Sequence, residues 1–219
     1  VSYDAKSIKD ERLSLEYEPK FLKQAQYRLF PFFDPISSQG MIKFPEEAIF
    51  FHESLDLYDF DNKLLAQTTQ KLNQIAKDLG VKFPIKKVFG KPTNMKPFDL
   101  GYLFVDRTGN IFNIKQADGK ISMKKIENTI NQKLAYVYIS ENKAKEFAGY
   151  AIDEASNFYL LTWDFGFIKI PIRGFDHKTM NLQIIANPVE FLVRFDDEKT
   201  YQAIVFDKNY KKIDEIKVD

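Results

Sequence analysis

Two histidines are the only imidazole side chains available for acid–base chemistry in this chain of 219 residues, which contains no cysteine. The lack of cysteine excludes a thiol nucleophile, a disulfide framework and a Cys-based zinc site. The members of a Ser–His–Asp triad come from distant parts of a chain, so a hydrolase with a cleft between the two halves of this protein is one hypothesis. His52 and His177 would be its candidate bases, but both are also typical of surface or satisfied structural positions, and no catalytic residue is assigned.

A cluster of acids between Asp56 and Asn62 could offer oxygen ligands to a calcium ion. Counted from Asp59, it matches the EF-hand calcium loop only at the first two required positions. The competing interpretation is the acidic entry to a helix, because carboxylates are favourable near the positive end of the helix dipole. We therefore expect no metal site and no cofactor.

Four residues are the candidates for ligand binding, namely Lys96, Asp99, Tyr159 and Trp163. Lys96 and Asp99 lie in a polar loop before a predicted strand, and loops beside a rigid sheet often carry binding residues. Tyr159 and Trp163 belong to an aromatic stretch that could form a stacking surface for a glycan or another flat ligand. Aromatic residues that alternate along a strand more often fill a core, so a purely structural role remains the alternative.

The charge balance argues against a nucleic-acid partner. The chain has 32 Lys and Arg against 31 Asp and Glu, a net charge of +1. Binding of nucleic acid usually requires a clearly basic face, and the lysine pairs at 86–87 and 124–125 are too short to form one.

The chain starts at Val1 and shows neither a signal peptide nor an apolar run close to 18 residues. A valine start predicts that something upstream has been removed, either a short tag or a signal or membrane anchor. The sequence leaves these two possibilities open.

The elements that must position the candidate residues change in character near residue 98. Residues 1–98 read as a mixed α/β part that holds most of the prolines. An amphipathic helix is predicted over about 62–79, with Asp61 or Asn62 as its N-cap and Gly80 as its stop. A shorter helix is predicted over about 20–29.

Residues 99–219 read as an antiparallel β-meander, with short strands and turn signals every 8 to 12 residues. Asp106, Asp153 and Asp207 each end an apolar strand and precede a short polar turn, at spacings of 47 and 54 residues. Such periods are typical of propeller blades, but about 120 residues cannot close a ring of four. We therefore expect an α+β fold, with a helix-containing N-terminal half packed on open, propeller-like hairpin repeats as one unit.

One stretch of the sequence combines a short polar element with a hairpin that begins at an aspartate. Its residues are Lys96, Pro97, Phe98, Asp99, Gly101, Tyr102, Asp106 and Gly109. This stretch, together with residues 27–33 and 160–172, resembles an uncharacterised bacterial cell-envelope family, the domain of unknown function 4857. The resemblance implies His at position 113, where this chain has Asn113.

The resemblance implies a hydrophobic anchor before Val1, an extracytoplasmic location and genes for ABC-type transporters nearby; it implies no activity. We therefore expect a non-enzymatic domain of a membrane-anchored envelope protein, acting as a partner or sensor module of a transport complex. The alternatives are a ligand- or glycan-binding module near Trp163 and the hydrolase described above.

Overall fold

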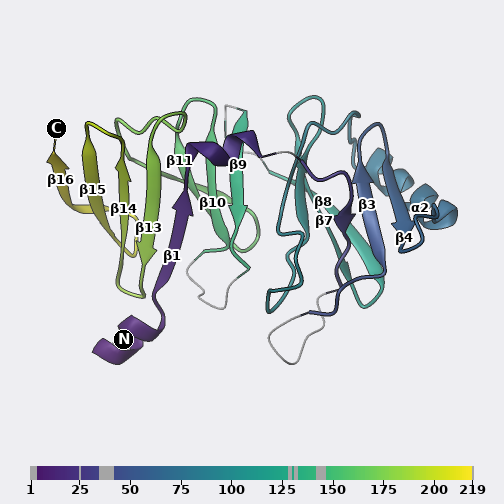
Figure 1. Cartoon of the computed structure of the whole chain (residues 1–219), viewed down its shortest axis with the longest axis horizontal. Coiled ribbons are helices and arrows are strands. Elements are labelled where there is room, and N and C mark those ends of the chain that lie inside the picture. Colours follow the sequence, from purple (N-terminus) through teal and green to yellow (C-terminus); the bar gives the residue numbers. More distant parts are fainter. Residues whose placement is uncertain are drawn as a thin grey trace.

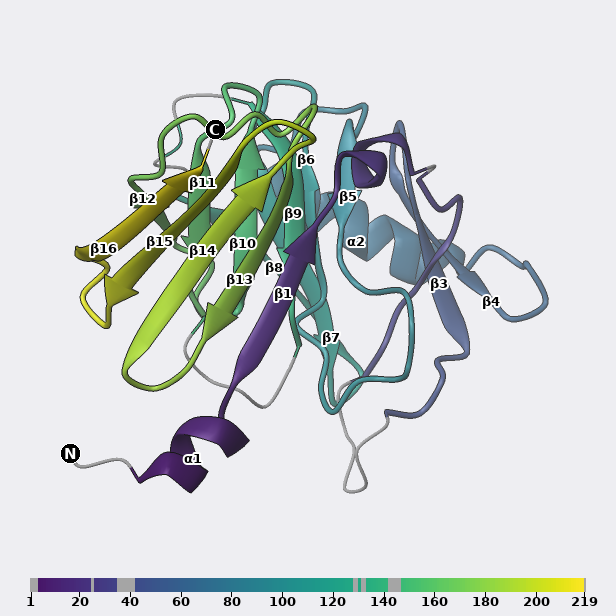
Figure 2. The same ribbon diagram turned by 60° about the vertical axis from the view of Figure 1, so that its left-hand side comes forward.

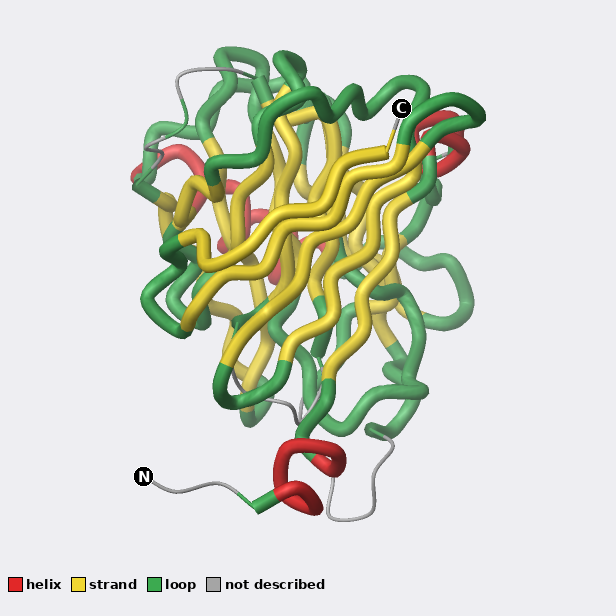
Figure 3. The backbone as a smooth tube through the Cα atoms, turned by 90° about the vertical axis from the view of Figure 1, so that its left-hand side faces the viewer, coloured by secondary structure: helices red, strands yellow, loops and turns green. Residues whose placement is uncertain are grey.

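The computed structural model describes residues 4–24, 26–34, 42–127, 130, 133–141 and 147–218. These residues form four antiparallel β-sheets that stand face to face in a row (Figure 1). We name them, in order along the row, the β13, β9, β5 and β2 sheets. Figure 3 looks along the row, with the β13 sheet in front of the others. A mostly antiparallel β-structure with few helices is consistent with the expected α+β class.

The β13 sheet has the strand order β1-β13-β14-β15-β16, and the β9 sheet has the order β12-β11-β10-β9. The strands of the β13 sheet are β1 (Leu13–Tyr17), β13 (Asn181–Ala186), β14 (Glu190–Asp196), β15 (Tyr201–Asp207) and β16 (Lys212–Val218). Those of the β9 sheet are β9 (Leu134–Ile139), β10 (Gly149–Asp153), β11 (Phe158–Leu161) and β12 (Phe167–Ile170).

The other two sheets follow the same antiparallel scheme, with the orders β5-β6-β7-β8 and β2-β3-β4. The strands of the β5 sheet are β5 (Lys87–Phe89), β6 (Tyr102–Val105), β7 (Ile111–Ala117) and β8 (Lys120–Ile126). Those of the β2 sheet are β2 (Phe30–Pro31), β3 (Glu47–Phe51) and β4 (Leu55–Asp59). The hairpins expected around Asp106, Asp153 and Asp207 are thus confirmed.

Helix α2 (Ala66–Asp78) is the long helix of the chain, and its start differs from the expected one. Its N-cap is Leu65, so the predicted caps at Asp61 and Asn62 are wrong. The chain first completes the turn after Asp59 and forms a bridge between Tyr58 and Leu64, which delays the helix. The predicted stop is confirmed, because Gly80 follows the helix with a φ of +79°, which suits glycine.

Two shorter helical elements lie near the start of the chain. These are the α-helix α1 (Ala5–Asp10) and the 3-10 helix η1 (Pro19–Lys23). The helix predicted over about 20–29 is therefore reduced to the single 3-10 element at its beginning.

Three apolar clusters lie between successive layers and hold the row together. One joins the β13 and β9 sheets, the second joins the β9 and β5 sheets, and the third joins the β5 and β2 sheets with α2. Each sheet buries large aromatic rings, among them Tyr17, Tyr150, Phe104 and Phe51, and this burial is the main driving force for stacking. Among the described residues no cluster joins the β13 sheet to the β2 sheet, so the row is open and no closed propeller is seen.

The N-terminal segment ties the two ends of the row together. Strand β1 pairs with β13 at one end, and β2 lies in the last sheet at the other end. Residues 18–24 and 26–29, which we call the strap, connect them and cross the edges of the β9 and β5 sheets (Figure 2). The boundary suggested at residue 98 falls between β5 and β6, which are neighbours in one sheet. The two parts of the chain therefore share two of the four sheets.

In each sheet an aspartate is the last residue of one strand or directly follows it, and organises the turn that comes next. The Oδ1 atoms of Asp106, Asp153 and Asp207 accept backbone N–H groups two and four residues further on. Asp59 makes the same pair of bonds with Asp61 and Lys63. In all four turns the third residue after the aspartate has a positive φ. The repeat therefore has four copies, of which the sequence pattern predicted three.

Candidate binding site on the loop between β5 and β6

Lys96 and Asp99, two of the predicted ligand-binding residues, lie together in a buried ion cluster. The Nζ atom of Lys96 bonds Oδ1 of Asp99, lies 3.0 Å from Oε2 of Glu141 and donates to the carbonyl oxygen of Lys91 at 2.8 Å. Lys96 and Glu141 are each only 2% exposed. Two hydrogen bonds and the ion pair with Glu141 engage the ammonium group inside the chain, so the role of Lys96 in this structure is to hold the loop.

The backbone around Asp99 explains why the loop turns into β6 at this point. Oδ2 of Asp99 accepts the N–H of Gly101 at 3.0 Å, and Oε1 of Glu141 accepts the N–H of Leu100 at 2.8 Å. Gly101 has a φ of +76°, and a Cβ there would lie 2.0 Å from the carbonyl oxygen of Ile114. Only glycine allows β6 to begin so close to β7.

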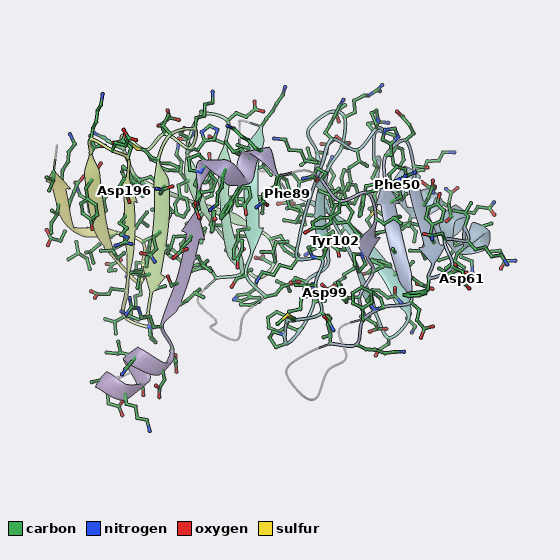
Figure 4. All side chains as sticks on the ribbon, in the orientation of Figure 1. Phe50, Asp61, Phe89, Asp99, Tyr102 and Asp196 are labelled. Atoms are coloured by element: carbon green, nitrogen blue, oxygen red, sulfur yellow. The ribbon has the colours of Figure 1, made fainter. Side chains whose placement is uncertain are left out.

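Asn113 on β7 serves the same loop. Its Nδ2 atom donates to the carbonyl oxygens of Leu100 at 3.0 Å and Tyr102 at 3.2 Å, and the side chain is buried. In this chain the position therefore holds the backbone at the start of β6. Figure 4 shows Asp99 at the lower end of the β5 sheet, near Tyr102 on β6.

The cluster brings two carboxylates to one ammonium group. Burial raises the pKa of Glu141 to about 7, with a further rise from the charge of Asp99, while Lys96 acts in the opposite direction. Uptake of one proton by Glu141 would leave the cluster without net charge. Glu141 is therefore the proton-binding group of this buried cluster. None of five cavities in the described part of the chain is lined by Lys96, Asp99 or Glu141.

Trp163 lies on the turn between β11 and β12, and it meets the same loop from the neighbouring sheet. Phe98 lies between the buried residues Lys96 and Asp99 in the sequence. The centroid of its ring is 5.8 Å from that of Trp163. Trp163 is 37% exposed, and Met95 on the loop is 78% exposed. We call Phe98, Trp163 and Met95 the aromatic platform. Phe98 and Met95 lie on the loop that the ion cluster holds in place.

Tyr159 does not belong to this platform. Its side chain is buried, its hydroxyl donates to Oδ2 of Asp153 at 2.9 Å, and its ring meets Phe167 edge-on at 6.4 Å. Burial and the contact with Asp153 raise the pKa of Tyr159. The residue thus supports the Asp153 turn from the core between the β9 and β5 sheets.

The two histidines have different surroundings. His52 is exposed and stacks on Phe50 at 5.7 Å. His177 is buried, and its Nδ1 atom lies 2.7 Å from Oγ of Ser156, which also accepts the backbone N–H of His177 at 3.3 Å. Burial lowers the pKa of His177, which favours the neutral ring. Ser156 and His177 form a local pair that fixes the ring, and no spacing in the sequence predicts this pair.

The acidic cluster between Asp56 and Asn62 is used for turns. Asp59 organises the turn after β4, and Asp56 accepts the hydroxyl of Ser54 at 2.8 Å. Within the described part of the chain, no group of three or more His, Cys, Asp or Glu residues is placed to hold a metal ion. No helix in that part is long and apolar enough to cross a membrane.

The Lys96–Gly101 element and the Asp106 hairpin are the features that carry the family resemblance, and a comparison with protein families decides the matter. The model of the family described as a domain of unknown function (DUF4857) matches residues 1–206. The chain belongs to this family. No curated protein and no solved structure is significantly similar to it. The DUF4857 match thus includes strands of all four sheets, ends within β15 before β16, and assigns no activity.

Glu141 is the residue of the site that sequence reasoning missed. It lies two residues after the end of β9, with a φ of +46°, which is uncommon for a residue other than glycine. A lone glutamate after a predicted strand carries no spacing signal toward Lys96. Only the stacking of the β9 sheet on the β5 sheet brings the two side chains together.

Proposed function

We propose that this DUF4857 chain is a non-enzymatic binding module that docks a partner protein through its aromatic platform. The observation that carries the proposal is the contact between Phe98 and Trp163 on a loop anchored by a buried lysine. Exposed tryptophan and methionine side chains are enriched at the centres of protein interfaces, where rigid anchors lose little entropy on binding. The stacking of the β9 sheet on the β5 sheet supports this use, because it brings the turn after β11 against the loop before β6.

The expected partner is a membrane transport protein encoded near the gene, as the family resemblance implies. We propose that the module lies outside the cytoplasm and is anchored through a segment encoded upstream of Val1. A hydrophobic segment in the upstream gene sequence supports this location. A full-length cytosolic protein that starts near Val1 overturns it.

The docking role is tested by affinity capture with the wild-type chain, the Trp163→Ala variant and a matched control, Phe60→Ala. Phe60 is also exposed but lies on the turn after β4, away from the platform. We expect transport subunits encoded nearby to be retained by the wild type and by the control and to be lost with Trp163→Ala. Equal retention by all three proteins excludes the platform as the docking surface.

A glycan ligand is the second candidate, because a tryptophan ring beside a phenylalanine ring can stack on a sugar face. Trp163 is the single tryptophan of the chain, so its fluorescence reports on the platform alone. Saturable quenching by oligosaccharides, abolished by Phe98→Ala, would favour this candidate over the protein partner.

A further inference from the structure

A cleft lies between the edges of the two central sheets, away from the aromatic platform. It has a volume of about 690 Å³, and its floor comes from β5 and β9, which are the adjacent edge strands of their sheets. The strap forms one wall, with Phe21 on η1 among its residues. Figure 2 shows β5 and β9 side by side with η1 above them. The volume is in the range of roughly 300–1,000 Å³ that is usual for small-molecule sites.

Lysine side chains line this cleft in excess over acids. Lys86, Lys87 and Lys178 contribute three positive charges, and Glu154 contributes one negative charge. A smaller adjoining cavity of about 200 Å³ shares Lys86, Lys87 and Glu154 and adds Arg107 and Lys133. In a chain with a net charge of +1, this is a local concentration of positive charge.

These cations are not neutralised by the chain itself. Within the described ranges, none of the five forms an ion pair with a carboxylate. Lys87 instead donates to the carbonyl oxygen of Leu134 at 2.9 Å, which holds its ammonium group between the two sheets. Asp106, the other acid of the smaller cavity, is occupied by the hydrogen bonds of its own turn.

Aromatic rings form part of the remaining lining and supply a place for an apolar body, beside Gln24 and Gln26. Tyr27 and Phe30 meet edge-on at 5.8 Å on the strap side, and Tyr136 on β9 packs against Phe21 at 5.9 Å. Phe89 on β5 also lines the cleft and lies between the central sheets in Figure 4. Aromatic walls with a few charged groups are the usual composition of a site for a small organic ligand.

His177 adds a polar group with a defined orientation. The oxygen of the Ser156 hydroxyl accepts the backbone N–H of His177, so the hydroxyl proton of Ser156 is free to be donated to Nδ1 of the ring. With Nδ1 as acceptor, the neutral ring carries its proton on Nε2. A neutral histidine in this form offers an N–H donor, which suits an anion without adding charge. The residue lines the cleft together with Lys178.

We propose that the cleft between β5 and β9 is a binding site for a small organic anion, with an aromatic or otherwise flat apolar body and a phosphate or carboxylate head. The head group lies among Lys86, Lys87 and Lys178, and the body lies between the strap and Tyr136. The residues of this site are not those of the aromatic platform, so the anion-binding proposal can be tested independently of the proposed docking function.

The test is calorimetric titration of the whole chain with phenyl phosphate, benzoate, inorganic phosphate and phenol. We expect phenyl phosphate or benzoate to bind saturably, with a Kd between about 10 µM and 1 mM. Inorganic phosphate, which has only the head group, and phenol, which lacks the anionic head, should each bind more weakly. The tighter of phenyl phosphate and benzoate identifies the head group. The affinity should fall as salt is raised, because the charges are partly exposed and are screened.

Two variants separate the charge from the apolar body. Lys86→Glu with Lys178→Glu should weaken phenyl phosphate and benzoate about tenfold or more, whereas Lys208→Glu, an exposed lysine on a distant turn, should change nothing. Tyr27→Ala should weaken phenyl phosphate and leave inorganic phosphate unchanged. Circular dichroism melting confirms that each variant is folded.

The proposal is overturned if neither phenyl phosphate nor benzoate binds saturably up to about 10 mM, a range that covers weak specific sites. It is also overturned if the double lysine variant binds as tightly as the wild type. If the affinity of the wild-type chain for these anions does not change with salt concentration, the role of the lysines is contradicted by the wild-type measurement alone.

Discussion

The ammonium nitrogen of Lys96 lies 3.0 Å from Oε2 of Glu141, although one residue precedes β6 and the other follows β9. The contact joins the β5 sheet to the β9 sheet at the end of the row's central interface. Both side chains are buried, so neither can be relieved by water if its partner is lost. The cluster therefore fixes the position of the loop and the position of the β5 sheet relative to the β9 sheet.

Replacement of Lys96 by methionine should be strongly destabilising. The change leaves Asp99 and Glu141 buried as two carboxylates without a cation, and breaking such a cluster costs about 3–5 kcal/mol. Urea unfolding should show the loss as a lower midpoint. Lys43→Met is the control, because its ion pair with Glu46 is exposed and contributes little. Equal effects of the two substitutions would contradict the proposed role of the cluster.

The stability of the protein should depend on the protonation of Glu141. Its pKa is raised from 4.5 to about 7 in the folded chain, so the folded state keeps the proton where the unfolded state has lost it. Stability from this group is complete below pH 4.5 and is lost as the pH rises through 7, by up to about 3 kcal/mol.

The measurement is the free energy of unfolding between pH 5 and pH 8 for the wild type and for Glu141→Gln, with fixed ionic strength. The variant lacks the titrating group, so the decline over this window should be much smaller. A decline of the same size in both proteins would assign the pH dependence to another group.

The four turn aspartates should differ in their contribution to stability. The buried Asp153 carboxylate accepts four hydrogen bonds, from Ala155, from two groups of Asn157 and from Tyr159. The half-buried Asp207 carboxylate accepts two backbone bonds. Asp153→Ala should cost about 2–3 kcal/mol and Asp207→Ala about 1 kcal/mol, since hydrogen bonds to a buried charged group contribute more. Thermal unfolding of both variants provides the comparison, and the reverse ranking would refute it.

Gly149 should not tolerate even a methyl group. A Cβ there would lie 1.9 Å from the carbonyl oxygen of Tyr138 on the neighbouring strand β9. Gly149→Ala must therefore push β9 and β10 apart, at a cost of about 2 kcal/mol or more. Gly119→Ala is a useful comparison, because no atom lies within 4 Å of its added Cβ and only its positive φ of 67° opposes the change. Melting temperatures should fall more for Gly149→Ala, and a smaller fall than in Gly119→Ala would show that the strands adjust.

Local features of the fold could be predicted from the sequence, because they depend on residues close in the chain. The hairpins at Asp106, Asp153 and Asp207 are predictable because each aspartate accepts hydrogen bonds from residues only two to four positions further on. Asp59 makes the same turn, but the other acids around it favoured an interpretation as a helix entry. The helix N-cap was misplaced for the same reason.

The site could be predicted only in part. Lys96 and Asp99 are three residues apart, and their pairing lies within reach of a sequence argument. The third member, Glu141, depends on how two sheets stack, and no spacing in the sequence encodes that. Tyr159 and Trp163 are close along the chain, yet Tyr159 points into the core while Trp163 lies on a turn, because neighbouring strand and turn residues face different sides.

Strand β1 also has a consequence for how the protein is made. It is synthesised before every other strand of the four sheets, but its partner β13 starts at residue 181, after the strands of the other three sheets. Those three sheets can form in the order of translation, whereas β1 has to wait, with its apolar residues Leu13, Leu15 and Tyr17 uncovered. Completion of the β13 sheet is thus a late step that joins β1 to the strands synthesised after all the others.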